Sequence, residues 1–281
     1  MSFLGLCDGD PIVNALRDVF GANIVRVPEE RIKPLRVVAS SDDKSSFRGE
    51  LTPLLKGNVA LNIPVTTSQM ADISGKRSRK VNIDLGLEIL DGFLKGFGIT
   101  SAEIGIKFQG ASEVSFSFKN VVRNYIDIGL LGKALAGQKV EKENPAARIF
   151  FDDTDYSFLV IDSVITSSDF LISVDKSSDS GFKLDIPTIQ NIVNKANVGV
   201  QVTTTNDYDI VFKGPEHLTF AFSCVKLYLD ADGTIMSMPP AYDVPALKIF
   251  LAKKETHVIE YSPDRVLLNA KPALLSWDKL G

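Results

Sequence analysis

The sequence contains few of the residues on which many function classes depend. Its 281 residues include two cysteines, too few for a disulfide framework, and two histidines. His217 and His257 have no cysteine or histidine neighbour at metal-ligand spacing, so we expect no metal site. Acidic residues outnumber basic ones by 35 to 31, which leaves no basic footprint for nucleic acid. No phosphate-binding glycine loop is present, and we expect no cofactor.

Long hydrophobic runs are also lacking. No apolar stretch approaches the ~18–20 residues that a membrane-spanning helix needs. The first residues lack the basic segment and the apolar core of a secretory signal. The chain has ample material for a core, with 44% hydrophobic residues, and its two cysteines favour a reducing compartment, so we expect a soluble cytoplasmic protein. Composition alone leaves its function open.

Alternation of apolar and polar residues dominates the middle of the chain and predicts strands with one buried face. The pattern occurs at residues 81–85, 104–108, 114–118, 170–174, 198–202 and 218–222. Further strands are expected at 23–27 and 34–38, with a loop over 40–46, and helices at 11–20, 87–97, 120–135 and 186–196. Because the strands follow one another without regular helical crossovers, we predict an α+β fold with a twisted, mainly antiparallel central sheet.

The C-terminal segment is too apolar to remain free in solution. Its large apolar residues include Leu267, Leu268, Leu274, Leu275 and Trp277. Burying these side chains contributes on the order of 10 kcal/mol. Ordering roughly fifteen residues at ~1 kcal/mol or more each offsets most of that. We therefore predict a tail, residues 256–281, that docks on a body, residues 1–255, while tethered and leaves once the chain is cut.

Asp230-Ala231-Asp232-Gly233-Thr234 resembles the first motif of haloacid-dehalogenase-like phosphatases, in which an aspartate nucleophile ends a strand. That fold requires a long α/β body after the motif, and only 47 residues follow Thr234. Asp-Gly between apolar runs is also typical of a hairpin turn, which is the interpretation we favour. A phosphatase that uses Asp230 and Asp232 stays the alternative.

Two other motifs were weighed for chemistry. Cys224 lies inside a strand pattern and is interpreted as a small core residue, with a nucleophile–base pair to a histidine as the alternative. The acidic run at residues 152–155 lacks the glycine and the final glutamate of a calcium loop, so a solvated turn is favoured. Neither motif supports an enzyme.

Two features point toward lipid. Lys76, Arg77, Arg79 and Lys80 form the one dense basic cluster. It is either a solvated hairpin loop or a contact with anionic head groups, worth about 1 kcal/mol per charge. Cys7 is either a free thiol without a role or the carrier of an acyl chain. A palmitoyl group would contribute on the order of 10 kcal/mol once buried.

The N-terminal region resembles that of bacterial gasdermins. The resemblance is carried by Cys7, Asp10-Pro11, an amphipathic first helix and the segment Val27–Leu35, in that order. The chain length, the helix-interrupted strands and the short apolar tail fit the same family. The resemblance implies a pore-forming effector of anti-phage defence that its tail keeps inactive. It also implies a palmitoyl group on Cys7, held in a hydrophobic pocket of the inactive form.

The same resemblance implies an activation mechanism. A partner protease removes the tail, and the cytoplasmic monomers then insert into the inner membrane and assemble into a large ring that kills the cell. Charged residues precede the tail, so we place the cut between Ala252 and Arg265. The candidate positions are Lys253, Lys254 and Arg265 for a trypsin-like protease and Asp264 for a caspase-like one.

Physical chemistry permits such a conversion. A barrel of strands satisfies every backbone amide, as a bilayer requires, and each strand needs ~9–11 residues to span it. Residues 58–118 and 156–212 contain enough alternating sequence for two hairpins. Alternation is equally expected of an ordinary half-buried sheet, so a soluble β-rich lipid- or protein-binding module without pore activity stays an alternative.

Overall fold

The computed structural model of the chain describes residues 23–29, 32–41, 45–71, 73–74, 93–94, 97, 99, 104, 114–152, 156–174, 185–196, 199–236 and 269–270. The strands are β1 Asn23–Glu29, β2 Arg36–Ser40, β3 Ser45–Glu50, β4 Val65–Gln69, β5 Ile73–Ser74, β6 Val114–Lys119, β7 Val122–Ile126, β8 Ser157–Val174, β9 Gln201–Asn206, β10 Asp209–Leu227 and β11 Asn269–Ala270. The helices are α5 Ile128–Leu135, α6 Ile149–Asp152, α7 Ile186–Ala196 and a 3₁₀ turn at Thr52–Leu54.

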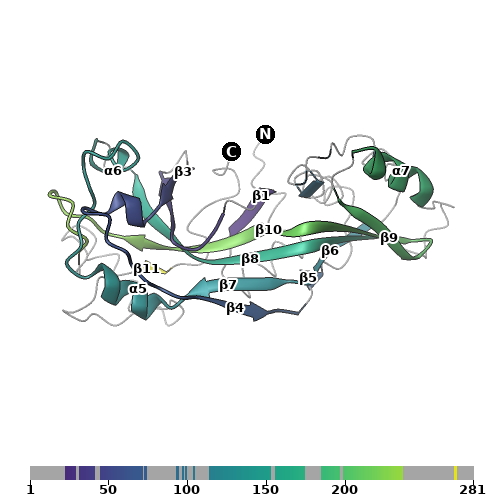
Figure 1. The fold of residues 1–281 in the computed structure, drawn as a ribbon, viewed down its shortest axis with the longest axis horizontal. Coiled ribbons are helices and arrows are strands. Elements are labelled where there is room, and N and C mark those ends of the chain that lie inside the picture. Colours follow the sequence, from purple (N-terminus) through teal and green to yellow (C-terminus); the bar gives the residue numbers. More distant parts are fainter. Residues whose placement is uncertain are drawn as a thin grey trace. The chain divides into compact units, whose positions relative to one another are not determined.

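The strands form one sheet organised by two long neighbours, β8 and β10 (Figure 1). The main strand order is β1-β10-β8-β2-β3. Along β8, residues 157–160 pair with β2 and residues 169–174 pair with β6, both antiparallel. The β2–β3, β5–β6 and β9–β10 pairs are antiparallel as well. The predicted fold class, a mainly antiparallel sheet with a few helices, is therefore confirmed.

The chain divides into two compact units, and β8 and β10 each pass from one into the other. The first unit comprises residues 1–31, 68–123 and 165–221, and the second comprises residues 32–67, 124–164 and 222–281. The first unit has an aromatic centre in which Phe118 stacks on Phe220 and meets Phe170 edge-on. The second unit has an aliphatic core, made largely of Val37, Leu51, Leu54, Leu55, Ile126, Leu131, Leu135, Val160 and Val225.

Helices α5 and α7 begin at aspartate caps. The Asp127 carboxylate accepts a hydrogen bond from Leu130 N at 2.8 Å, which satisfies an amide of the first turn of α5. Asp185 accepts from Thr188 N at 3.2 Å at the start of α7, where Ile189 and Val193 are buried one turn apart. The helix predicted at 186–196 is confirmed with the same bounds.

Three predictions of secondary structure are wrong in part. The helix expected at 120–135 begins only at Ile128, because residues 122–126 are drawn into the sheet as β7. Ile104 lies in helical backbone, which contradicts the predicted strand at 104–108 at the residue described there. The loop expected over 40–46 ends early, since β3 starts at Ser45. The elements predicted at 11–20 and 81–85 lie outside the described residues.

Among the residues that the structure describes, no helix combines the length and the apolar character needed to cross a membrane.

Candidate functional site

Strand β8 is almost entirely buried and carries an unusual polar segment. Its residues 158–170 are all buried, as expected for a strand covered on both faces. Within that stretch the buried polar side chains are Asp162, Ser163, Thr166, Ser167, Ser168 and Asp169. Buried polar groups are destabilising unless they are hydrogen-bonded, so their partners reveal what the segment does.

The partners of residues 166–169 lie around the junction of β6 and β7. Asn120 Nδ2 donates to Asp169 Oδ2 at 2.8 Å, and Ser168 Oγ donates to the other carboxylate oxygen at 2.8 Å. Ser167 Oγ lies 2.5 Å from the carbonyl oxygen of Lys119. The polar segment therefore ties the middle of β8 to the point where its neighbouring strand is interrupted.

Cys224 is a core residue in the second unit. Its side chain is buried, and burial raises the pKa of the thiol above its ordinary value, with the nearby Asp162 carboxylate adding to that effect. A thiol held in its neutral form is a poor nucleophile. His217 is exposed on the same strand, and His257 lies outside the described residues. The interpretation of Cys224 as a core residue is thus confirmed.

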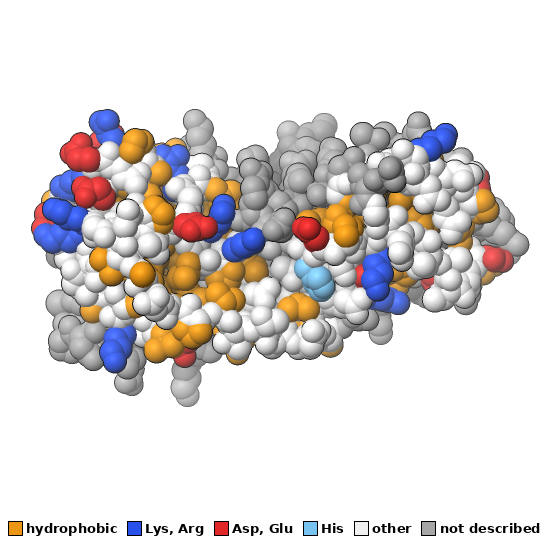
Figure 2. All heavy atoms as spheres, viewed as in Figure 1, with side chains coloured by type: hydrophobic (Ala, Val, Ile, Leu, Met, Phe, Trp, Pro, Cys, Tyr) orange, Lys and Arg blue, Asp and Glu red, His pale blue; other side chains and the backbone are white. Residues whose placement is uncertain are grey.

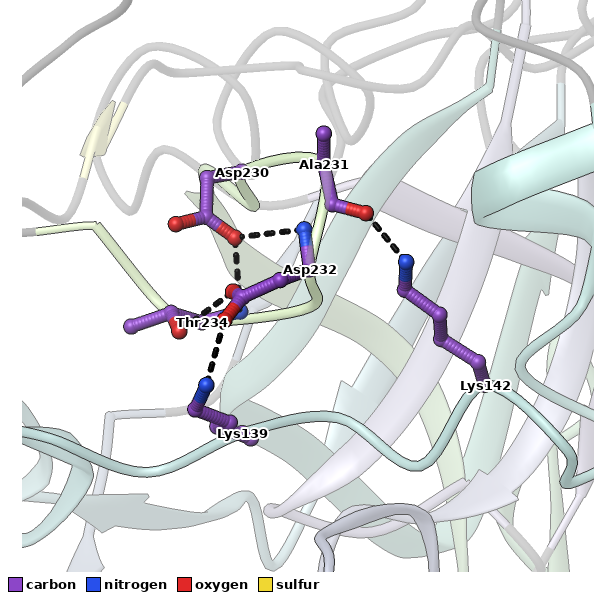
Figure 3. A network of polar contacts seen from close by, with 6 residues as sticks. All are labelled: Lys139, Lys142, Asp230, Ala231, Asp232 and Thr234. Carbon is purple, nitrogen blue, oxygen red and sulfur yellow. Dashed lines mark hydrogen bonds and ion pairs between the residues drawn. The ribbon is translucent and has the colours of Figure 1, made fainter.

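Asp230 and Asp232 close a tight hairpin turn (Figure 3). Leu229 and Ile235 bridge across it, and Asp230 Oδ1 accepts from the backbone nitrogens of Asp232 and Thr234 at 2.9 Å each. Asp232 Oδ1 accepts from the Thr234 hydroxyl at 2.6 Å. The predicted hairpin turn is confirmed, and both carboxylates of the phosphatase alternative have a structural role in it.

Two lysines bind this turn to the neighbouring loop. Lys139 Nζ donates to Asp232 and Lys142 Nζ donates to the Ala231 carbonyl (Figure 3). The hydrogen bonding of Asp232 with Asp230, and then with Lys139 and Thr234, lowers the pKa of Asp232. The hydrogen bond to Asp232 raises the pKa of Lys139. These groups are exposed, so the pair is a surface feature rather than a buried reactive centre.

Acidic and basic side chains are intermixed around α6 and this turn, whereas apolar side chains form separate patches (Figure 2). Arg148, directly before α6, and Asp152, at its end, form one such pair, with Arg148 Nε 3.5 Å from Asp152 Oδ2. Large hydrophobic side chains that are exposed include Phe47, Val59, Val65 and Leu130. Such mixed charge is typical of a solvated surface.

The described part of the predicted tail pairs with the sheet. In β11, Ala270 is the antiparallel partner of Val225 and Asn269 is the partner of Lys226, both in β10. A strand of two residues contributes little by itself, but it places residues 269–270 beside β10. The contact joins residues that are more than forty positions apart in the chain.

The other candidate residues from the sequence lie outside the described residues. They are Cys7, the basic cluster Lys76, Arg77, Arg79 and Lys80, the cleavage candidates Lys253, Lys254, Asp264 and Arg265, and the tail residues Leu267, Leu268, Leu274, Leu275 and Trp277. Their predicted roles stay predictions.

Comparison with known proteins gives a consistent result. Residues 25–234 match the model of the Bacterial Gasdermin Family. The chain belongs to the bacterial gasdermins. A gasdermin from a Desulfuromonadales bacterium is 31% identical over 79% of this chain and 82% of its own length. A gasdermin from Vitiosangium sp. is 28% identical over 80% of this chain and 83% of its own.

A solved structure agrees with the gasdermin assignment at the level of the fold. The structure of a bacterial gasdermin from Bradyrhizobium tropiciagri superposes with a TM-score of 0.52 at 16% identity, covering 81% of this chain and 90% of that one. The resemblance inferred from the N-terminal residues is therefore confirmed. The polar segment of β8 was not found by reasoning from the sequence, because serine, threonine and aspartate in a strand pattern normally indicate an exposed face.

Proposed function

We propose that this gasdermin is a pore-forming effector that its C-terminal tail holds inactive. Membership of the family over residues 25–234 is the observation that carries the proposal. The family consists of pore-forming effectors and not of known enzymes, which also favours this function over the phosphatase alternative.

The long strands supply suitable material for a membrane-spanning sheet. β8 has 18 residues and β10 has 19, and each exceeds the ~9–11 residues that a membrane-spanning strand needs. In β10, Leu218, Phe220 and Phe222 lie on one face, whereas Thr219 and Ser223 lie on the other. The same apolar face packs against a protein core in the inactive form and against lipid hydrocarbon in the membrane.

The tail is proposed to act as a plug on the body. Its described residues Asn269 and Ala270 add a short strand to β10, one of the two strands at the centre of the sheet. A protease that cuts between Ala252 and Arg265 leaves the tail held only by its own contacts. Because those contacts barely exceed the entropy cost of ordering the tail, it then dissociates and uncovers the edge of β10.

Liposomes loaded with a self-quenching dye test the proposal on the full chain. The recognition site of a sequence-specific protease is inserted between Ala252 and Arg265. The intact protein is expected to release no dye, and cutting it is expected to start release. A matched control chain carries the same site with its scissile residue replaced. If the cut protein binds vesicles without leakage, the chain is a lipid-binding module. If it neither binds nor leaks, the proposal is wrong.

The finer features of the proposal concern lipid and location. Palmitoylation of Cys7 would add the mass of a palmitoyl group to the intact chain purified from bacteria, and Cys7→Ala would remove it and slow killing after cleavage.

Lys76, Arg77, Arg79 and Lys80 are proposed to contact anionic head groups of the inner membrane. We place the protein in the cytoplasm before cleavage and in the inner membrane afterwards, where a ring of protomers kills the infected cell as a defence against phage.

A further inference from the structure

Strands β6 and β7 are neighbours of β8 and are separated from each other by a short kink. β6 ends at Lys119 and β7 begins at Val122, so only Asn120 and Val121 separate them. Both strands pair with β8. Asn120 has a φ of 52°, in the left-handed region, which disfavours side chains with a branched Cβ. We call this feature the Asn120 kink.

Side chains of β8 hold the Asn120 kink from three positions. Asn120 Nδ2 donates to the buried Asp169 carboxylate at 2.8 Å. Ser167 Oγ, on a fully buried residue, lies 2.5 Å from Lys119 O. Thr166 Oγ1 donates to the carbonyl oxygen of Val122 at 3.3 Å. The hydrogen bonds flank the kink on both sides, so extending the backbone at Asn120 requires breaking them.

Neither β6 nor β7 is long enough to span a membrane, but a single strand made of both would be. β6 has six residues and β7 has five, whereas a spanning strand needs ~9–11. Apolar residues also recur in the same phase on either side of the kink. If residues 114–126 were one extended strand, Val114, Phe116, Phe118, Val122 and Ile126 would share one face. Asn120 and Asn124 would lie on that face as well, and the opposite face would carry Ser115, Ser117, Lys119 and Arg123 together with Val121 and Tyr125.

We propose that the Asn120 kink is a latch that keeps β6 and β7 apart in the inactive protein. On activation Asn120 leaves the left-handed region, its bond to Asp169 breaks, and residues 114–126 become one spanning strand. The inference rests on the proposed function, because it describes a step of pore formation. Releasing the tail removes the plug, and opening this latch then limits the rate of insertion.

The test measures the initial rate of dye release after cutting the full chain at the inserted protease site. Asn120→Val disfavours the left-handed backbone and removes the bond to Asp169. Ser167→Ala removes the contact with Lys119 without altering residues 114–126. Each variant is expected to release dye roughly fivefold faster than the unmodified sequence, the factor that about 1 kcal/mol corresponds to.

Each variant has a matched control elsewhere in the chain. Asn62→Val places the same side chain at another exposed left-handed asparagine, with a φ of 45°. Ser223→Ala removes a hydrogen bond of 3.0 Å to Asp162, away from the kink. Rates for both controls are expected to match the unmodified chain. Urea unfolding of each uncut variant shows how far a general loss of stability contributes.

The outcomes separate the latch from the pore. If the cut unmodified chain leaks, and Asn120→Val and Ser167→Ala leak no faster than their controls, the latch is wrong and the pore-forming proposal stands. If the cut unmodified chain does not leak, both fall. Should Asn120→Val fail to fold, Ser167→Ala against Ser223→Ala decides the question alone.

Discussion

Replacing Phe118 by alanine removes a ring of β6 that contacts phenylalanines of β8 and β10 in the first unit. The Phe118 side chain is 1% exposed. Its ring stacks on that of Phe220 with centroids 3.8 Å apart and planes within 3°, and it meets Phe170 at 5.2 Å and 65°. These contacts join β6, β8 and β10, so the ring is part of the packing between the strands as well as of the core.

The expected cost follows from burial. A fully buried phenylalanine replaced by alanine lowers the free energy of unfolding by about 3–5 kcal/mol, because transfer energy is lost and a cavity remains. Total stabilities are roughly 5–15 kcal/mol, so this change removes a large share. Phe118→Leu keeps most of the volume and is expected to cost less than about 1.5 kcal/mol.

Urea unfolding of the full chain, followed by far-ultraviolet circular dichroism, measures these differences. Phe47→Ala is the matched control, because Phe47 is 40% exposed and its ring centroid lies 6.4 Å from that of Phe222. A surface change of this kind is expected to cost roughly 0.5 kcal/mol. If Phe118→Ala lowers the stability no more than Phe47→Ala does, the assignment of Phe118 to the core is refuted.

Two further substitutions test the second unit. Gly233 has a φ of 89°, and an added Cβ would lie 2.7 Å from the Val140 carbonyl oxygen. Gly137 also has a positive φ, 72°, but has open space around it. Gly233→Ala is therefore expected to lower the urea midpoint more than Gly137→Ala does. Equal midpoints would contradict the close approach. Because burial and Asp162 raise the pKa of Cys224, the folded chain holds that proton more tightly than the unfolded one. The free energy of unfolding should therefore fall as the pH rises above the unfolded value of ~8.5, and Cys224→Ala should flatten that slope. Parallel slopes would show that the thiol does not titrate differently on folding.

Local patterns predicted the parts of the fold that depend on neighbouring residues. The helical pattern of residues 186–196 predicted α7 with its observed bounds, and Asp185 caps its first turn. The Asp-Gly sequence between apolar runs predicted the turn after Leu229. Each has hydrogen bonds between residues a few positions apart, which a sequence displays directly, although Lys139 and Lys142 also bind the turn from a distant segment.

Prediction was poorer where an element depends on distant partners. Residues 122–126 show helical spacing with the segment that follows, but pairing with β8 and β4 makes them a strand. The continuity of β8 was also missed, since the run Thr166–Asp169 interrupts the alternation that defines a strand. The partners of that run around Asn120 lie more than forty positions away, and no local pattern indicates them.

The sequence by itself therefore determined the antiparallel strand composition, helix α7, the 230–235 turn and membership of the gasdermin family. Tertiary structure alone decided which strands merge into β8 and β10, where the tail meets β10, and why polar side chains are tolerated in the middle of a buried strand. The reason is physical. Periodicity and caps are set by adjacent residues, whereas strand pairing and the satisfaction of buried polar groups are set by residues that only the folded chain brings together.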